Sequence, residues 1–587
     1  MMKKTYWLIT LSIMLLMSSL TPAAAEESKK VVKIGITGDE STLNPYTYIT
    51  GYPGLDLVNL LYDNLFQLDE ENTPQPWLVD EYKVSQDGLN YEMKLHDDVL
   101  WQDGKKLTTD DVAFTIQYFL DHPKSRFTSP LEEIKKVEIK DDKTIILRLS
   151  KANPNFLIQP LADLPILPKH IWKDIKNPDE SSNSLGSGPY QLKEYKSGQY
   201  YKMVAHQKYF KGKPQIDELI FPIIEDTTAL YTALQAGEID AASSSVSPEL
   251  VKQFEGASNL KIMKGAGYNT SLFQMNAEKY PMTEKEFRQA IAYAIDTQYL
   301  VDHVLLGYAE KGSPGFIHPS SPAYNSSLTF KPSKEKANQI LDDAGFIDKD
   351  KDGYREDPNG KKLQLTSLVY ADNPIRIRTA EIIADWLKEV GIRVSVKAMD
   401  ATTVDSLMWP EFDVSKGRDY DLGLWSWSST MQLFPDRLVD LFHSDPAIGT
   451  VNIGGYKNNK FDSMVSALKD AKTEEDRLAK IKEMQAFVSD EMPIVPLYYQ
   501  EIVNAYNPKA YDGYTFQLGK GIIHKGSFIP FENGEKSAQT QDADSGDVKN
   551  SETNTNSNKS LIILGLLVIV VIIGVFFIKK KVNGKKG

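Results

Sequence analysis

Three aspartates at alternate positions precede a glycine in the run Asp348-Lys-Asp350-Lys-Asp352-Gly353. Oxygen ligands at the first, third and fifth positions before a glycine are typical of the start of a calcium-binding loop. The twelfth position, where such a loop has a bidentate glutamate, is Asn359. A solvated polar turn between a helix and the next strand explains the same residues. The run therefore predicts either a weak calcium site, with the three aspartates as ligands, or a turn.

A second candidate site is aromatic. Residues 420–424 alternate as in a strand, and at its carboxyl end come Trp425, Trp427, Ser428, Ser429 and Thr430. In α/β sheets, ligands gather at the carboxyl ends of strands. An indole offers a flat apolar face and an N–H donor, which suit a peptide side chain or a sugar ring. Burial of both tryptophans in a core is an equally good interpretation.

Local signatures of catalysis are missing from the sequence. None of the eight histidines is followed by Glu, and no two lie within one helical turn. The G-x-S-x-G and G-x-x-x-x-G-K motifs do not occur either. We therefore predict a protein that is not an enzyme and needs no cofactor.

The elements that must position these residues alternate between strand and helix patterns. Apolar residues alternate over 363–369, follow helical spacing over 383–390, and alternate again over 392–396, with Gly391 as a helix stop. This unit predicts two parallel strands with a right-handed crossover. Further helices are predicted from Thr108, and from a capping box formed by Thr283 and Glu286. The fold class is α/β with mixed sheets.

The N-terminal residues predict a secretory signal peptide over residues 1–25. Lys3 and Lys4 precede an apolar stretch at 6–20, which ends in Pro22-Ala-Ala-Ala25. A basic start, a short apolar run and an A-x-A site are the layout of a cleaved leader.

The C-terminal residues predict a membrane anchor. Residues 561–578 carry no charge, and five lysines follow within 579–587. At about 1.5 Å per residue, this helix nearly spans a hydrocarbon core of ~30 Å. Clustered lysines stay on the cytoplasmic side, which places the preceding chain outside the cell. Residues 533–560 are polar and without aromatics, and are predicted to form a flexible stalk.

The intervening 500 or so residues exceed what one hydrophobic core usually serves, so two or more domains are expected. The chain has no cysteine and a formal net charge of −13. An acidic chain of this kind argues against a nucleic-acid partner.

From about residue 31 to 511, the chain resembles the family 5 extracellular solute-binding proteins, the peptide and nickel receptors of ATP-driven importers. The resemblance is carried, in sequence order, by Leu43-Asn-Pro45, Tyr62-Asp-Asn-Leu65, Pro76-Trp-Leu78, Ser85-Gln-Asp-Gly-Leu89, Trp101-Gln-Asp-Gly104, Thr108-Thr-Asp-Asp-Val112, Gly186-Ser-Gly-Pro-Tyr190, Ala233-Leu-Gln-Ala-Gly-Glu-Ile-Asp240 and Arg288-Gln-Ala-Ile-Ala-Tyr-Ala-Ile-Asp296.

The resemblance implies a two-lobed fold of the type II periplasmic-binding-protein kind. One lobe would comprise residues 26–65, 185–268 and 493–532, with a subdomain inserted at 66–184, and the other lobe residues 269–492. The lobes would close on a solute, and the permease and ATPase subunits of an importer would receive it from a monomeric protein. Besides the aromatic run, it implies cleft residues at Asn44, Tyr52, Tyr498 and Tyr499.

The sequence departs from the family at one place. Peptide-binding relatives have an aspartate for the peptide ammonium where this chain has Thr430 and Met431, and Phe434-Pro435 replaces their Asp-Pro. Asp436 follows but is out of register. We expect a peptide held by its backbone first, an oligosaccharide second and a nickel chelate third. A surface-anchored hydrolase and an adhesive or signalling receptor remain as alternatives.

Overall fold

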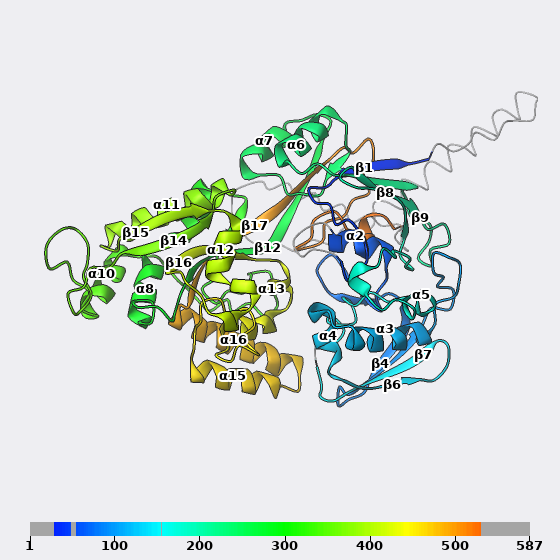
Figure 1. Cartoon of the computed structure of the whole chain (residues 1–587), viewed down its shortest axis with the longest axis horizontal. Coiled ribbons are helices and arrows are strands. Elements are labelled where there is room, and N and C mark those ends of the chain that lie inside the picture. The colour runs from blue at the N-terminus through cyan, green and yellow to red at the C-terminus, as the bar shows by residue number, and fades with distance from the viewer. Residues whose placement is uncertain (1–28, 48–53, 154, 530–587) are drawn as a thin grey trace, which may run out of the picture. The chain divides into compact units, whose positions relative to one another are not determined.

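The computed structural model describes residues 29–47, 54–153 and 155–529 (Figure 1). The predicted signal peptide, Tyr52, the stalk at 533–560, the anchor at 561–578 and the basic tail lie outside these residues. Within the described residues, no helix has both the length and the apolarity needed to cross a bilayer.

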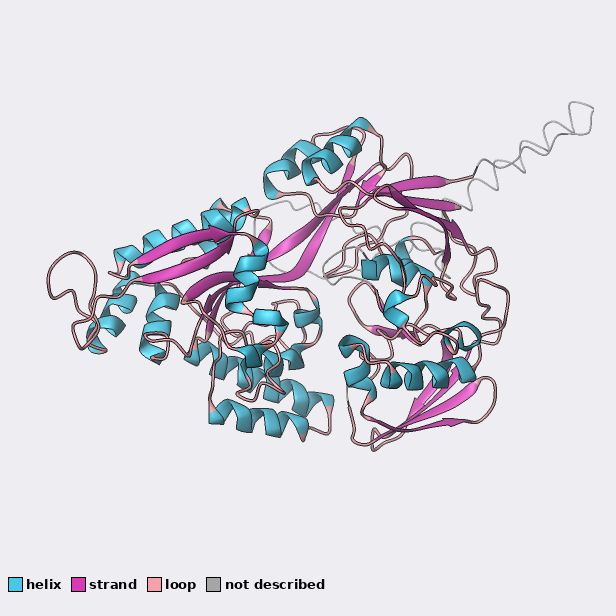
Figure 2. Cartoon of the chain, in the orientation of Figure 1, coloured by secondary structure: helices cyan, strands magenta, loops and turns pink. Residues whose placement is uncertain are grey.

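The first half of the described chain has runs of short strands separated by helices. Figure 2 shows the helices and strands of the described chain. Its elements are β1 (Val31–Gly35), α2 (Gly54–Leu61), β2 (Phe66–Leu68), β3 (Pro74–Pro76), β4 (Val79–Val84), β5 (Asn90–Leu95), α3 (Thr109–Asp121), α4 (Ser125–Leu131), β6 (Ile134–Ile139), β7 (Thr144–Leu149), α5 (Lys169–Trp172), β8 (Tyr190–Lys196), β9 (Tyr200–Ala205), β10 (Glu218–Pro222), α6 (Thr227–Ala236), β11 (Ala241–Ala242) and α7 (Pro248–Glu255).

The second half is richer in helix. Its elements are β12 (Lys261–Met275), α8 (Lys285–Ala294), α9 (Thr297–His303), β13 (Ala309–Lys311), α10 (Lys334–Asp343), β14 (Leu365–Tyr370), α11 (Pro374–Glu389), β15 (Val394–Met399), α12 (Ala401–Met408), β16 (Leu422–Trp427), α13 (Thr430–Leu433), α14 (Leu438–Phe442), α15 (Asn459–Lys469), α16 (Glu474–Glu491) and β17 (Ile494–Tyr506).

One mixed sheet links both halves of the chain. Its strand order is β15-β14-β16-β12-β17-β11-β1-β10-β9-β8, and β13 pairs with β17 outside this path. A separate antiparallel sheet, β4-β5-β7-β6, lies within residues 66–184. The fold is therefore a two-lobed α/β fold with mixed sheets, as predicted.

Strands β12 and β17 are the longest and pair antiparallel along most of their length. Their register shifts between Gly265 and Asn269 and again between Ser271 and Leu272. Tyr268, inside the first irregularity, has a φ of 60°, a left-handed value that is uncommon for a residue other than glycine. The two irregularities place local bends in the pair of strands that both halves of the sheet share.

The predicted strand–helix–strand unit is confirmed. Strands β14 and β15 pair in parallel, from Leu365 opposite Val394 to Tyr370 opposite Met399, and α11 connects them (Figure 1). Helix α11 buries Ala380, Ile383 and Leu387 on one face, which is the spacing that the sequence shows.

The two predicted helix starts differ in outcome. Thr108 caps α3 in a capping box with Asp111, whose side chain accepts from the Thr108 backbone N–H. The capping box predicted for Thr283 and Glu286 is wrong, because α8 is capped at Glu284 and no side chain makes the capping bond. The Thr283 hydroxyl donates to the Glu284 carboxylate instead, at 3.0 Å.

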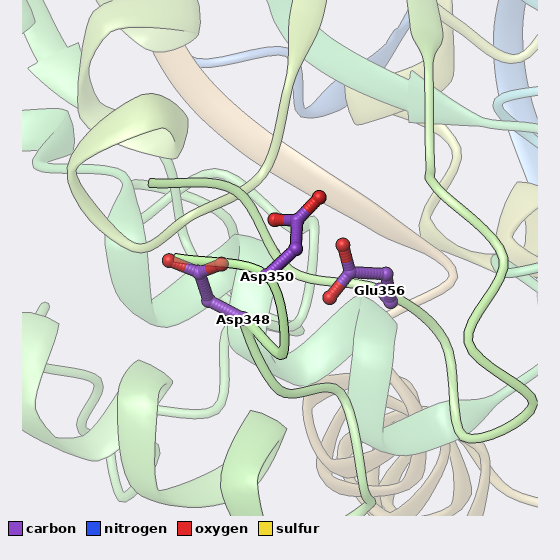
Figure 3. A group of neighbouring side chains, drawn as sticks. All are labelled: Asp348, Asp350 and Glu356. Atoms are coloured by element: carbon purple, nitrogen blue, oxygen red, sulfur yellow. The ribbon is translucent and has the colours of Figure 1, made fainter. Parts of the chain in front are cut away.

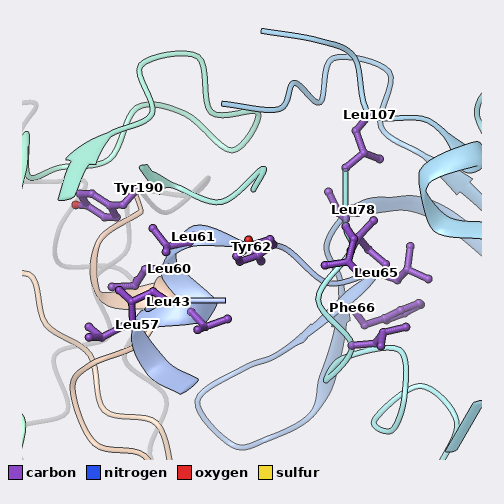
Figure 4. Close-up of a cluster of buried hydrophobic side chains, with 14 of the residues drawn as sticks. Leu43, Leu57, Leu60, Leu61, Tyr62, Leu65, Phe66, Leu78, Leu107 and Tyr190 are labelled. Atoms are coloured by element: carbon purple, nitrogen blue, oxygen red, sulfur yellow. The ribbon is translucent and has the colours of Figure 1, made fainter. Parts of the chain in front are cut away.

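The largest hydrophobic cluster of the described residues has its buried members between Val32 and Phe221, at Ala241, and between Tyr506 and Phe528. Figure 4 shows some of its members from the first of these segments. It combines Ile34 of β1 and Leu61 of α2 with Phe119 of α3 and Phe528 near the end of the described chain. Residues 66–184 therefore share a core with the strands around them.

A buried ion pair ties the end of the described chain to this core. The Lys525 ammonium donates to the Asp63 carboxylate and to the Tyr62 carbonyl oxygen, both at 2.7 Å. Trp77 and Tyr209 donate to the same Asp63 oxygen, at 3.0 and 2.9 Å. The other carboxylate oxygen accepts from the Ser187 hydroxyl at 2.9 Å. The Asp63 and Lys525 side chains are 0% and 1% exposed.

Candidate functional site

A cavity of about 370 Å³ lies next to the bent strands β12 and β17. Its lining comes from segments far apart in the sequence, which include the helix α2, residues 158–163, the turn after β11, the turn after β16 and residues 517–523. This volume is within the range of about 300–1,000 Å³ that small-molecule sites occupy.

The uncharged lining mixes apolar and hydrogen-bonding groups. Its apolar side includes Ile36, Leu57, Ile158, Leu433, Phe434 and Ile502. Its polar side includes Asn59, Gln67, Ser243, Ser244, Asn269 and Gln517. Amide and hydroxyl groups both donate and accept, so they can bind an extended chain of amides without selecting its side chains.

The charged groups of the lining are two acid–base pairs. Arg126 donates to Asp163 through two nitrogens, at 2.9 and 2.7 Å. Lys520 lies 3.6 Å from the Asp56 carboxylate. Burial raises the pKa of Asp56, and the charge of Lys520 acts against that rise. Each carboxylate of the cavity therefore has a basic partner.

Of the residues that the sequence proposed for ligand binding, Ser428 and Ser429 line this cavity. They follow directly after β16, which extends to Trp427, so the tryptophans lie within the strand and not beyond it. Thr430 begins the short helix α13, whose last residue, Leu433, also lines the cavity.

Trp425 and Trp427 are not part of the lining. They are 6% and 8% exposed and belong to a hydrophobic cluster with Met408 and Leu438. Their rings and that of Trp409 meet edge to face, with centroids 5.7–6.3 Å apart. None of the three indole N–H groups has a hydrogen-bond partner among the described residues. The role of Trp425 and Trp427 in ligand binding stays a prediction.

Asn44, Tyr498 and Tyr499 are buried as well, at 0%, 2% and 1% exposure. The Asn44 side chain accepts from the Tyr46 backbone N–H at 2.7 Å and donates to the Ser181 carbonyl at 2.5 Å. The Tyr499 hydroxyl donates to the Phe316 carbonyl at 2.6 Å. These bonds occupy the polar groups of Asn44 and Tyr499 within the protein, and a direct contact with ligand stays a prediction for all three residues.

Most of the lining could not be predicted from the sequence. Arg126, Asp163 and Lys520 come from three unrelated segments, and no local spacing relates them. One signal was available, because the serines at 243–245 directly follow the buried strand β11, at a carboxyl strand end.

The acidic turn brings together a different set of carboxylates from the predicted one (Figure 3). Oxygens of Asp348, Asp350 and Glu356 all lie within 4.8 Å of one another. Asp352 instead pairs with Lys362 at 2.7 Å, and Lys362 also pairs with Asp350 at 2.5 Å. The lysine already supplies positive charge to two of the three predicted ligands. Calcium binding at Asp348, Asp350 and Asp352 stays a prediction.

A two-lobed α/β fold, with a solute-sized cavity beside the strands that both lobes share, defines the class of solute-binding proteins. Residues 73–448 match the family of bacterial extracellular solute-binding proteins, family 5 (middle region). The chain belongs to this family.

Individual relatives agree with this assignment. The chain is 30% identical to the oligopeptide-binding protein AppA of Bacillus subtilis over 506 residues, which cover 84% of this chain and 90% of that protein. The structure of that protein with a nonapeptide matches with a TM-score of 0.69, over 85% of this chain and 98% of the other. The structure of NikZ from Campylobacter jejuni with Ni(L-His) matches at 29% identity and a TM-score of 0.70, over 85% of this chain and 97% of the other.

Proposed function

We propose that this chain is the solute-binding receptor of an ATP-driven importer and that its ligand is a peptide held mainly by its backbone. The observation that carries the proposal is the cavity lining, in which amide and hydroxyl side chains stand beside apolar ones. The similarity to an oligopeptide-binding protein supports the same ligand class. Closure of the lobes would hide the solute and present one conformation to the permease and ATPase subunits.

The two acid–base pairs determine whether the cavity can bind the charged amino terminus of a peptide. A ligand ammonium would have to displace Lys520 from Asp56 or Arg126 from Asp163, and each displacement would leave a partly buried base without its acidic partner. Thr430 stands where relatives have the aspartate for the ammonium. The cavity therefore does not depend on a free peptide amino terminus.

A peptide with a free amino terminus and its acetylated form are expected to bind within about tenfold of each other, a difference of about 1.4 kcal/mol. Isothermal titration of the isolated protein with both forms measures this ratio. A hundredfold preference for the free amine would contradict the expectation and assign the ammonium to Asp56 or Asp163.

A thermal-shift screen, which measures the unfolding temperature with each candidate ligand, identifies the ligand. A ligand at a hundred times its dissociation constant adds about 2.7 kcal/mol of stability. The screen includes a peptide library, linear oligosaccharides and nickel with histidine, so each alternative ligand is an outcome. Stabilisation by an oligosaccharide or by the nickel chelate alone would overturn the peptide assignment.

We also propose that residues 561–578 anchor the receptor in the cell membrane, with its globular part outside the cell. The support is the uncharged run and the lysines that follow it. The full chain is expected to stay with membranes through alkaline extraction, whereas a chain ending at Phe531 is expected in the soluble fraction. Release of the full chain by alkali would contradict the anchor.

A further inference from the structure

Asn155 lies at the start of a turn that forms one wall of the cavity. Its carbonyl oxygen accepts from the backbone N–H groups of Ile158 and Gln159, at 2.9 and 2.8 Å. Ile158, with Ala162 and Asp163 further along, lines the cavity. The Asn155 side chain is therefore fixed to a lining segment without being part of the lining.

Asp436 has the corresponding place on the opposite wall. It follows two residues after Phe434, which lines the cavity. One oxygen of its carboxylate is ion-paired with Arg477. The Arg477 side chain is only 7% exposed, and its remaining nitrogens bind the Glu474 carboxylate at 2.7 and 2.6 Å. Arg477 thus orients Asp436 from within its own wall.

The second oxygen of Asp436 accepts from the Asn155 side-chain amide, at 3.0 Å. This bond joins residues 281 positions apart, one on each wall, and neither of them lines the cavity. A hydrogen bond to a charged acceptor is stronger than one between neutral groups. Because Arg477 orients the Asp436 carboxylate, this acceptor needs little reordering to bind the Asn155 amide. Any separation of the two walls has to break it.

We propose that Asn155 and Asp436 form a clasp that favours the closed cavity and slows ligand release without contacting the ligand. The proposal rests on the proposed function, because it assumes that the walls separate when ligand enters and leaves. A contact made only in the closed conformation shifts the open–closed equilibrium by its own free energy, whatever the ligand is. Asn155 and Asp436 are thus positioning residues that determine affinity.

Two substitutions test the clasp. Asn155→Ala removes the donor, and Asn155→Asp sets a second carboxylate against Asp436. Asn90→Ala is the matched control, because Asn90 accepts from the charged Arg148 side chain at 2.6 Å within residues 66–184 and does not cross the cavity.

Dissociation of the peptide found in the screen, measured by surface plasmon resonance, is expected to be about tenfold faster for Asn155→Ala, which loses one hydrogen bond to a charged group, and faster still for Asn155→Asp. It is expected to be unchanged for Asn90→Ala. The urea midpoint of the ligand-free protein should stay close to that of the parent in both Asn155 variants. A lower midpoint with unchanged dissociation would assign Asn155 a purely structural role and overturn the clasp.

A measurement without ligand keeps this test separate from the proposed function. The chain has no cysteine, so Lys151→Cys and Glu475→Cys provide two unique exposed positions for spin labels, one near each end of the clasp. Pulsed electron–electron double resonance should show longer distances between the two spin labels in Asn155→Asp than in the parent. Identical distance distributions would overturn the clasp. A parent protein that binds nothing in the screen would count against the proposed function alone.

Discussion

Replacing Lys525 with Met is expected to lower the free energy of unfolding by about 3–5 kcal/mol, the cost of breaking a buried ion pair from one side. The Asp63 carboxylate would stay fully buried with the Trp77, Tyr209 and Ser187 donors but without a positive charge. The Tyr62 carbonyl oxygen would also lose its ammonium donor. Urea denaturation followed by tryptophan fluorescence measures the change.

The control is an ion pair of the same kind at the surface. Lys261 and Asp512 lie 2.7 Å apart, with side chains 53% and 44% exposed. Lys261→Met is expected to cost less than about 1 kcal/mol, because solvent screens exposed pairs. Equal losses in the two variants would show that the burial of Asp63 and Lys525 has no energetic consequence.

Replacing Trp427 with Ala is expected to remove about 3–5 kcal/mol of stability, the usual cost of truncating a large aromatic side chain in a core. The loss arises because Trp427 packs edge to face against Trp409 and Trp425, with centroids 5.7 and 5.9 Å away. Thermal and urea unfolding of the ligand-free protein measure it, and titration with ligand separates it from any change in affinity.

Ser428→Ala provides the comparison, since Ser428 is the next residue, is exposed and lines the cavity. Its expected effect on stability is within about 0.5 kcal/mol, as for most surface substitutions. If Trp427→Ala instead weakened ligand binding and left the unfolding midpoint unchanged, Trp427 would be a ligand-contacting residue.

Periodic elements of the fold were predictable from the sequence, because a short window contains their whole signal. The strand–helix–strand unit over residues 363–396 was predicted from alternation and helical spacing alone, and β14, α11 and β15 confirm it. The capping box predicted at Thr283 was wrong, because residue spacing shows a compatible pair but not the backbone geometry, and α8 is capped at Glu284. The Thr283 hydroxyl donates to the carboxylate of the adjacent Glu284 and not to a backbone group of the helix.

The cavity was less predictable than the fold. Ser428 and Ser429 could be proposed from the sequence because they follow a recognisable strand. Arg126 and Lys520 also line the cavity, but only the tertiary fold brings their distant segments there. The tryptophans show the limit of residue type as a guide, since an indole suits a binding surface and a core equally well. Asp436 follows shortly after the position where relatives have the aspartate for an ammonium, but its carboxylate binds Arg477 and Asn155.

The place of β17 in the large sheet has a consequence for when the protein can fold. This strand, residues 494–506, lies between β11 and β12 and is among the last described elements to be synthesised. Until it arrives, both neighbours have an open edge, which is a template for pairing with other chains. At about 5–20 residues per second, β17 is synthesised tens of seconds after β11 and β12, which lack a pairing partner on one edge during that time. A chaperone that holds the chain extended would be compatible with this order, because neither half of the sheet can be completed early.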